Sequence, residues 1–176
     1  MPETLGLPQW IVLAVVLQRL AELAIAQRNT ARLMAQGGTE IGRAHYFPIV
    51  AIHAAWLVAI FVRVPPDAAL NTALLVAFLM LQLGRVWVIA SLGRYWTTRI
   101  ITLPGAPLVT SGPYRWFRHP NYIIVALELA ILPLAFADWI VAAAFTGANA
   151  ALMSIRIPME NKALATRRAC EARRGL

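Results

Sequence analysis

Hydrophobic residues gather in five long runs along the chain, separated by polar and charged segments. Each run is roughly 16–25 residues long, the length that an α-helix needs to cross a bilayer. The pattern therefore predicts an all-α integral membrane bundle of five transmembrane helices, with residues 1–176 forming a single domain. The expected spans are residues 8–26, 47–64, 68–92, 121–137 and 140–157.

Polar residues between the runs indicate how the chain turns. Only Asp138-Trp139 separates the fourth run from the fifth, so these two spans should form a tight helical hairpin. Residues 29–36 predict a short amphipathic helix in the first loop, closed by Gly37-Gly38. Residues 158–174 predict a separate helix outside the bilayer, with Pro158 in its first turn.

Basic residues are distributed unevenly between the two ends of these spans. Of the 16 Lys and Arg residues, 13 lie in segments that this topology places on one side, and only Arg63 lies on the other. Because cytoplasmic loops carry an excess of Lys and Arg, the N-terminus is expected outside and the C-terminus in the cytoplasm. The net charge of +8 then reflects loops beside anionic lipid, and no nucleic-acid partner is expected.

The composition supports a membrane protein without a metal centre. Hydrophobic residues make up 60% of the chain and charged residues 14%, against about a quarter charged in a soluble domain. The lone Cys170 offers no disulfide framework. No metal is expected, because His45, His53 and His119 do not have the spacing of metal ligands.

Five ionisable residues fall well inside the expected spans, away from their ends, where charges are costly and usually face the interior of the bundle. Arg19 and Glu22 lie three residues apart on one helix face and can neutralise each other. Arg85 has no local partner and should pair with Glu22 or Glu128. For His53 and Glu128 two interpretations stay open, a structural pairing within the bundle and contact with a substrate.

The polar block from Gly112 to Tyr122 is the strongest candidate for a site. Gly112 permits a turn, and Pro120 should force His119 out of the helical region of backbone conformation. Backbone donors, a His and two Tyr side chains then converge at the start of a helix, which suits an anionic or zwitterionic ligand. The alternative is an interfacial anchor, since Arg, Trp and Tyr are common at the headgroup level of any membrane protein.

The order of residues in this block resembles the signature of the isoprenylcysteine carboxyl methyltransferase family, which consists of integral membrane enzymes that use S-adenosylmethionine. The matching residues are Gly112-Pro113-Tyr114, Arg118-His119-Pro120 and Tyr122, with Arg156 and Glu160 after a helical hairpin. The resemblance covers about the C-terminal half. More weakly, the whole chain resembles a bacterial branch linked to type III polyketides. The features shared with that branch are Ala26-Gln27-Arg28-Asn29, His45-Tyr46, the segment from Gly93 to Arg99, and Leu103-Pro104-Gly105.

The resemblance implies roles for individual residues. Arg156 aligns with an Arg beside the methyl acceptor, where it would hold an oxyanion during a direct in-line transfer. S-adenosylhomocysteine would be the second product. The residues that align with cofactor contacts are Ala106, Pro107, Leu108, Val109, Tyr114, His119, Pro120, Asn121, Tyr122 and Glu160.

Two departures from the family pattern bear on the acceptor. Ala106 stands where the family has an acceptor-side His, and Arg99 falls near the place of a cofactor-contacting Gln. Both disfavour a prenylcysteine acceptor. The resemblance to the polyketide-linked branch implies a different function, O-methylation of a lipophilic alkylpyrone or alkylresorcinol drawn from the membrane lipid of a bacterial inner membrane.

Other readings of the sequence stay open. They are a carboxyl methyltransferase of a prenylated thiol acid, a phospholipid N-methyltransferase, an NADPH-dependent reductase and a non-catalytic membrane protein. The sequence gives no indication of the oligomeric state.

Overall fold

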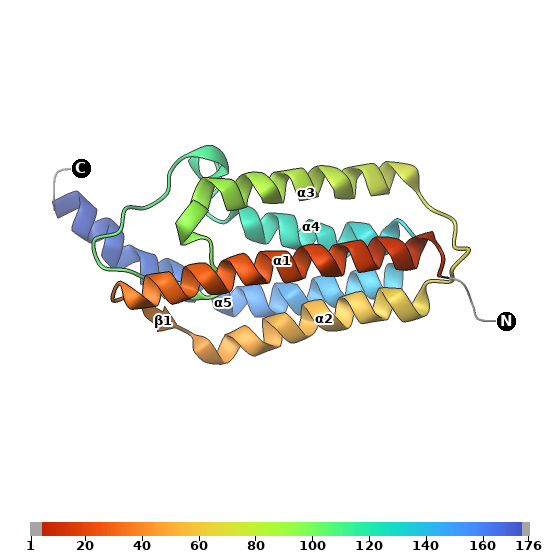
Figure 1. Cartoon of the computed structure of the whole chain (residues 1–176), viewed down its shortest axis with the longest axis horizontal. Coiled ribbons are helices and arrows are strands. Elements are labelled where there is room, and N and C mark those ends of the chain that lie inside the picture. The colour runs from red at the N-terminus through yellow and green to blue at the C-terminus, as the bar shows by residue number, and fades with distance from the viewer. Residues whose placement is uncertain (1–4, 174–176) are drawn as a thin grey trace.

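Five α-helices run side by side along the long axis of the molecule (Figure 1). The computed structural model describes residues 5–173, with side chains described for residues 5–165. The all-α architecture predicted from the sequence is confirmed. The helices are α1 (Leu7–Ala35), α2 (Tyr46–Arg63), α3 (Thr72–Leu92), α4 (Pro120–Leu134) and α5 (Trp139–Arg173).

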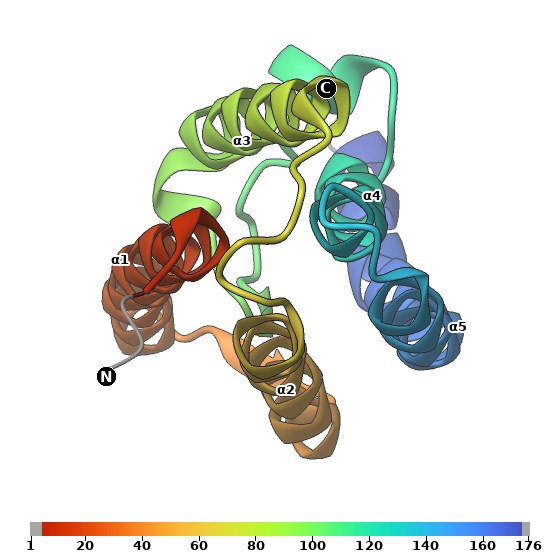
Figure 2. The same ribbon diagram turned by 90° about the vertical axis from the view of Figure 1, so that its right-hand side faces the viewer.

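Viewed end-on, the helices form a ring in the order α1, α2, α5, α4 and α3 (Figure 2). Helix α4 packs against α3 and α5, while α2 packs against α1 and α5. The α4–α5 turn and the α2–α3 connection lie at one end of the bundle, here named the hairpin end. The other end holds the remaining connections and the later part of α5, and is named the loop end.

Four of the helices are long and apolar enough to cross a membrane, namely α1, α2, α3 and α5. Helix α4 is apolar but has only 15 residues, where the sequence predicted a span over residues 121–137. Its hydrophobic run continues to Ala137, yet the helix ends at Leu134 and a turn follows, in which Ala137 has a φ of 59°. The protein is an integral membrane protein.

The prediction of a separate amphipathic helix over residues 29–36 is wrong. Helix α1 continues without a break to Ala35, and the chain turns at Gly37, whose φ of 88° is in the left-handed region. The side chain of Asn29 donates hydrogen bonds to the backbone carbonyls of Gly93 (3.1 Å) and Trp96 (2.9 Å). These tertiary bonds satisfy a polar residue that, read from the sequence alone, suggested a new helix start.

Two other helix boundaries differ from the prediction. Helix α3 begins at Thr72 and not at residue 68, because the side chain of Asn71 caps it by accepting a bond from the Leu74 amide (3.1 Å). The expected C-terminal helix is not separate either, since α5 passes through Pro158. Residue 174, the last residue of that expected helix, lies outside the described residues.

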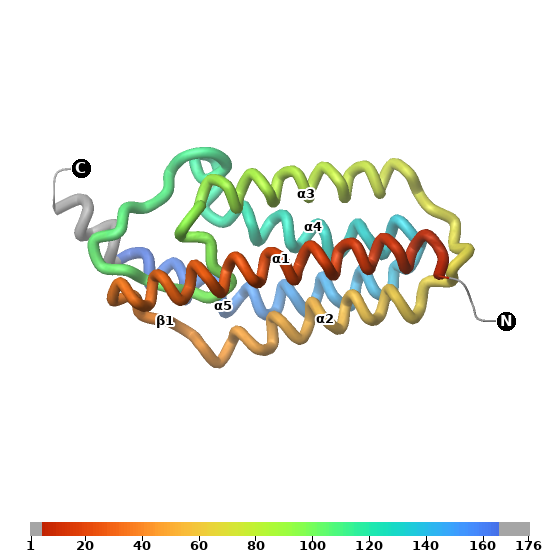
Figure 3. Tube along the Cα trace, in the orientation of Figure 1, coloured from red at the N-terminus to blue at the C-terminus, as the bar shows by residue number. Residues whose placement is uncertain are grey.

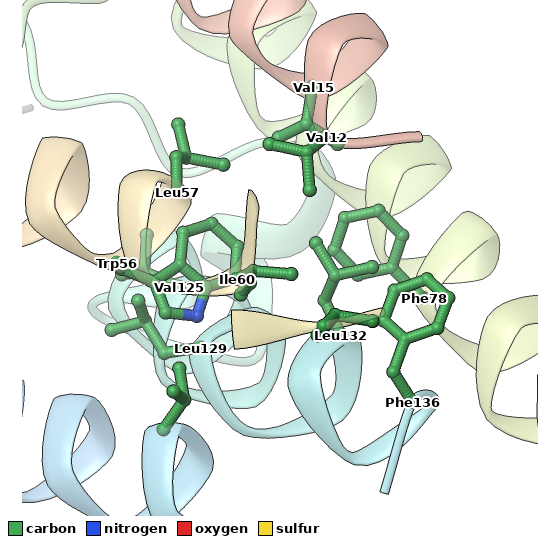
Figure 4. Packing of buried hydrophobic residues seen from close by; sticks show 12 residues of the cluster. Val12, Val15, Trp56, Leu57, Ile60, Phe78, Val125, Leu129, Leu132 and Phe136 are labelled. Atoms are coloured by element: carbon green, nitrogen blue, oxygen red, sulfur yellow. The ribbon is translucent and has the colours of Figure 1, made fainter. Parts of the chain in front are cut away.

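The apolar core lies towards the hairpin end, where side chains from α1, α2, α3 and α4 meet (Figure 4). Trp56 and Ile60 of α2 pack there with Leu129 and Leu132 of α4, all almost fully buried. In lipid the tails are as apolar as leucine, so helices associate through close van der Waals packing and polar contacts. This packed core fixes α4, which carries the candidate site at its other end.

At the loop end a short antiparallel ribbon joins two connections that are distant in sequence. Strand β1 (Thr39–Ile41) pairs with β2 (Ile100–Thr102), with Thr39 opposite Thr102. Arg99 forms an ion pair with Glu40 (2.7 Å) beside the ribbon. The chain between β2 and the short 3₁₀ helix η3 (Gly112–Arg115) then loops around this end of the bundle (Figure 3).

Candidate functional site

The hydroxyl group of Tyr122, in the first turn of α4, contacts two residues of α5. It donates a hydrogen bond to the Glu160 carboxylate and accepts one from Nε of Arg156 at 2.8 Å. Arg156 and Glu160 are four residues apart, so they lie one above the other on the same helix face. One phenol therefore joins α4 to a cation and an anion of α5.

Arg156 also connects α5 to the segment before β2. Its Nη2 donates to the backbone carbonyl of Thr98 at 2.7 Å, and the residue is only 8% exposed. These two bonds use two of the five N–H donors of the guanidinium. The guanidinium is thus fixed in position while donors remain for a ligand.

His119 completes the cluster from the residue that precedes α4. Its backbone has φ −133° and ψ 59°, which confirms that Pro120 forces it out of the helical region. Nε2 of the ring lies 3.0 Å from Oδ1 of Asn161, and Nδ1 lies 3.7 Å from Glu160. The ring stacks on Tyr122, with centroids 5.3 Å apart.

Gly112 allows the polar block to lie close against α3. Its φ is 60°, and a Cβ at this position would lie 2.2 Å from Oγ of Ser91. Tyr114, two residues later, packs against a small buried cluster that includes Val88 and Trp96. Burial, and then the negative charge of Glu160, raise the pKa of Tyr114 well above its usual value. Tyr114 is therefore a neutral phenol that lies close enough to Glu160 for the two to interact electrostatically.

The structure thus brings together four residues of the predicted site: His119, Tyr122, Arg156 and Glu160. Pro120 is buried as the first residue of α4. Residues 106–109 lie in the connection between β2 and η3, where Ala106 is 8% exposed. The cofactor contacts assigned to Ala106, Pro107, Leu108 and Val109 stay predictions.

Asn121 faces a different set of residues. Its Oδ1 lies 3.5 Å from Nη1 of Arg85, which places it beside a network of charges inside the bundle. Glu128 belongs to this network, because Arg85, Arg19 and Gln82 all donate hydrogen bonds to its two oxygens.

Arg85 also lies 3.4 Å from Glu22, so it pairs with both carboxylates considered in the sequence analysis. Glu22 in turn accepts from Arg19 at 2.8 Å, as the three-residue spacing predicted. The network therefore joins α1, α3 and α4 about two turns from Tyr122 along α4.

His53 and Glu128 lie apart from the Tyr122 cluster in their hydrogen bonding. Nδ1 of His53 lies 2.7 Å from the carbonyl of Ile49 in its own helix. A substrate role for either residue stays a prediction.

Sequence reasoning missed two partners of the cluster. Asn161 orients His119, and Thr98 offers a backbone carbonyl to Arg156. The position of Thr98 inside the shared segment from Gly93 to Arg99 was the only signal for it. Every residue type has a backbone carbonyl, so the identity of residue 98 does not indicate this contact.

A groove of about 490 Å³ runs between α4 and α5 from this cluster towards the middle of the bundle. Tyr122 and Pro158 line it at the site, and apolar side chains such as Ala126 and Met153 line it farther along. Its volume is within the range typical of small-molecule pockets. The polar cluster therefore opens into an elongated, mainly apolar groove.

A model of the isoprenylcysteine carboxyl methyltransferase (ICMT) family matches residues 73–166, more than half of the chain. The chain belongs to this family. The matched region includes all four residues of the cluster, from His119 to Glu160. The uncharacterized protein YpbQ of Bacillus subtilis (strain 168) is 37% identical to this ICMT-family chain over 162 residues, which cover 88% of the chain and 95% of the relative.

Proposed function

We propose that this ICMT-family protein is an S-adenosylmethionine-dependent O-methyltransferase of a lipophilic acceptor, an alkylpyrone or alkylresorcinol with an acidic hydroxyl group. One observation carries the proposal. The Tyr122 hydroxyl joins Arg156 and Glu160 at the point where a mainly apolar groove meets the polar loop end. A hydrophobic tail and an anionic head would both find partners there.

The side chains of the cluster fit S-adenosylmethionine. The Glu160 side chain is 26% exposed and can accept hydrogen bonds from ribose hydroxyls or an amino group. The His119 ring stacks on Tyr122 beside this carboxylate, and its nitrogens can hydrogen-bond the carboxylate end of the cofactor. When bound, this cofactor supplies an electrophilic methyl group on a sulfonium sulfur.

Arg156 would hold the oxygen that receives the methyl group. A guanidinium beside a hydroxypyrone or phenol lowers the pKa of the acceptor and favours its ionised form. The proton leaves to solvent before transfer. The acceptor oxygen would bond to the methyl carbon as the carbon–sulfur bond breaks, so that the products would be the methyl ether and S-adenosylhomocysteine. The main task of the protein is to align the two reacting atoms.

The topology supports access from two sides. The basic connections lie at the loop end, so the excess of Lys and Arg favours a cytoplasmic position for that end, where the cofactor is available. The acceptor would come from the lipid of a bacterial inner membrane through the groove between α4 and α5. Neither substrate would have to cross the bundle.

The positive charge of Arg156 also favours some of the alternative acceptors over others. An amine that attacks a methyl group gains positive charge, which a neighbouring guanidinium opposes. A phospholipid amine is therefore disfavoured. The carboxylate of a prenylated thiol acid would suit Arg156, so carboxyl methylation is the second candidate function.

The test is calorimetric binding of S-adenosylhomocysteine to the purified protein, followed by transfer assays with a panel of acceptors. We expect micromolar binding that His119→Ala weakens about tenfold or more, since it removes a ring that stacks on Tyr122 and bonds Asn161. Methylation of alkylpyrones or alkylresorcinols, with no methylation of prenylated carboxylates or lipid amines, would support the proposed acceptor. A folded wild-type protein that binds no S-adenosylhomocysteine would contradict the methyltransferase assignment.

A further inference from the structure

One face of α5 carries polar groups far beyond the cluster at the loop end. Thr146, Asn149, Met153, Arg156 and Glu160 follow one another at intervals of three or four residues, which places them on a single helix face. At 1.5 Å per residue, Asn149 lies about 10 Å from Arg156 along the axis, and Thr146 about 15 Å. The first three residues line the groove between α4 and α5.

The two polar residues in the groove lack partners. Oγ1 of Thr146 is buried and has no hydrogen-bond partner among the described residues. Asn149 is only 2% exposed, and no residue of the described part of the chain hydrogen-bonds its amide group. A buried polar group without a partner is unfavourable, and hydrocarbon supplies no water to satisfy it.

A third polar residue of the groove behaves differently. Oγ of Ser154 donates to the carbonyl of Ala151 in its own helix at 2.7 Å. This is the usual way in which a hydroxyl is satisfied within a membrane helix. Thr146 could make the same bond, yet its hydroxyl is unpaired. Among the polar side chains that line the groove, those of Thr146 and Asn149 are therefore the ones without a partner among the described residues.

We infer that Asn149 and Thr146 bind a second oxygen function of the methyl acceptor, a hydroxyl or carbonyl group placed within its chain about 10–15 Å from the oxygen that is methylated. This inference rests on the proposed function. The reacting oxygen lies against Arg156, and the chain follows the apolar wall past Met153. The acceptor is then an oxygenated lipid, because a plain alkyl chain would leave both polar groups of α5 unpaired.

The experiment compares two probes that differ in one group. The first is a resorcinol with a long saturated alkyl chain, and the second carries a single ketone about 10 Å from the ring hydroxyl. Native mass spectrometry measures the binding of each probe to the detergent-purified protein loaded with S-adenosylhomocysteine. We expect the ketone probe to bind about five- to tenfold more tightly, the worth of roughly one hydrogen bond.

Two variants test whether the tighter binding of the ketone probe arises in the groove. Asn149→Leu should abolish it without weakening the plain probe, since leucine fills a similar volume. Ser154→Ala is the matched control and should retain the preference, because the hydroxyl it removes is already bonded within α5. The affinity for S-adenosylhomocysteine should be the same in all three proteins.

Several outcomes would overturn the inference. Equal affinity of the wild type for both probes is one, and a preference that survives in Asn149→Leu/Thr146→Val is another. A wild-type dimer that Asn149→Leu converts to a monomer would assign this face to a second copy of the chain. A protein that binds neither S-adenosylhomocysteine nor either probe would instead refute the proposed function, and the inference with it.

Discussion

Tyr122 holds together two residues of α5 on either side of a weak point in that helix. Pro158 has no backbone N–H, so it cannot donate to the carbonyl four residues earlier and disfavours a regular helix there. Arg156 precedes it and Glu160 follows it, and both hydrogen-bond to the Tyr122 hydroxyl. The phenol thus replaces part of the support that the proline removes, within the site itself.

Removing this hydroxyl should affect the site more than the overall arrangement of the helices, which the apolar core holds together. Tyr122→Phe keeps the ring but loses two hydrogen bonds to charged groups, each worth about 1.5–3 kcal/mol. We expect the affinity for S-adenosylhomocysteine, measured by calorimetry, to fall by about tenfold or more. Tyr95→Phe is the control, since its hydroxyl accepts only an exposed bond from Arg94. Equal affinities in the two variants would remove Tyr122 from the site.

Substitutions of Arg156 and Glu160 should affect different steps, turnover in the first case and cofactor binding in the second. Arg156→Ala is expected to lower turnover at least about 100-fold, as the loss of a preorganised electrostatic contact does elsewhere, with a smaller loss of cofactor affinity. Glu160→Ala should mainly weaken the binding of S-adenosylhomocysteine. Steady-state kinetics and calorimetry on the same preparations measure both. A similar loss of both quantities in Arg156→Ala would indicate a purely structural residue.

Residue identity predicted most of this cluster. His119, Tyr122, Arg156 and Glu160 belong to patterns with fixed spacing, and the structure places them together. Residue identity could not predict that the Asn121 side chain faces Arg85 and not the cluster. Neighbouring positions of a helix point in directions about a quarter turn apart. Side-chain direction depends on the helix register, which a short motif does not specify.

Among the elements, η3 depends on a single glycine. Gly112 has a positive φ and lies against Ser91, so any side chain there adds backbone strain and a close contact. Gly112→Ala should displace η3 from α3 and cost about 1–2 kcal/mol from the left-handed conformation alone. Thermal unfolding in detergent measures this cost. Gly147→Ala is the control, since its Cβ would meet open space. Equal stability of both variants would contradict the account.

The start of α5 depends on Asp138. Its carboxylate accepts from the Val141 amide (3.1 Å), the pattern of an N-cap, and also from Arg63 (3.0 Å). Burial opposes ionisation, but the bonds from Arg63 and the backbone outweigh it and lower the pKa of Asp138. The ionised Asp138 carboxylate therefore stabilises the folded state fully above the unfolded-state pKa of about 4. This stabilisation is lost as the pH falls through the lower folded-state pKa.

Substitutions at Asp138 test the cap separately from the charge. Asp138→Ala should destabilise the protein by about 1 kcal/mol in thermal unfolding at neutral pH, the usual cost of a lost N-cap. Asp138→Asn keeps a capping oxygen and should lose less. If the asparagine variant is as unstable as the alanine variant, the ion pair with Arg63 and not the cap stabilises this turn.

The hydrophobic pattern is sufficient to locate the helices but not to define where they begin and end. Runs of apolar residues located all five helices, although only four of them are long enough to cross a bilayer. The ends were less predictable. The cap at Asn71 and the passage of α5 through Pro158 depend on contacts that the pattern does not contain. Short polar stretches such as residues 29–36 are ambiguous for the same reason.

Across the whole molecule, the buried ion network joins α1 to α3 and α4, two helices against which α1 packs little. Two cations, Arg19 and Arg85, meet two anions, Glu22 and Glu128, and the group as a whole is neutral. Removing one partner of a buried pair leaves an uncompensated charge and typically costs 3–5 kcal/mol. The sequence predicted these charges to pair, but only the ring of helices shows that all four form one network.

A double substitution tests this balance of charge. Arg85→Met should strongly lower the thermal stability in detergent, because one cation then faces two carboxylates. Arg85→Met/Glu128→Met restores a one-to-one balance between Arg19 and Glu22 and should recover much of the loss. If the double variant is no more stable than Arg85→Met, the network does not act through compensation of charge.

The same network imposes an order on biosynthesis. Helix α1 enters the membrane with Arg19 and Glu22, and α3 follows with Arg85, but Glu128 arrives only with α4. Until then the growing chain holds more intramembrane cations than anions, an expensive state for a helix in lipid. A ribosome-bound chain that stops after α3 should therefore hold this helix poorly at the translocon. Synthesis of α4 neutralises the excess and at the same time delivers Tyr122, so stable insertion and assembly of the site coincide.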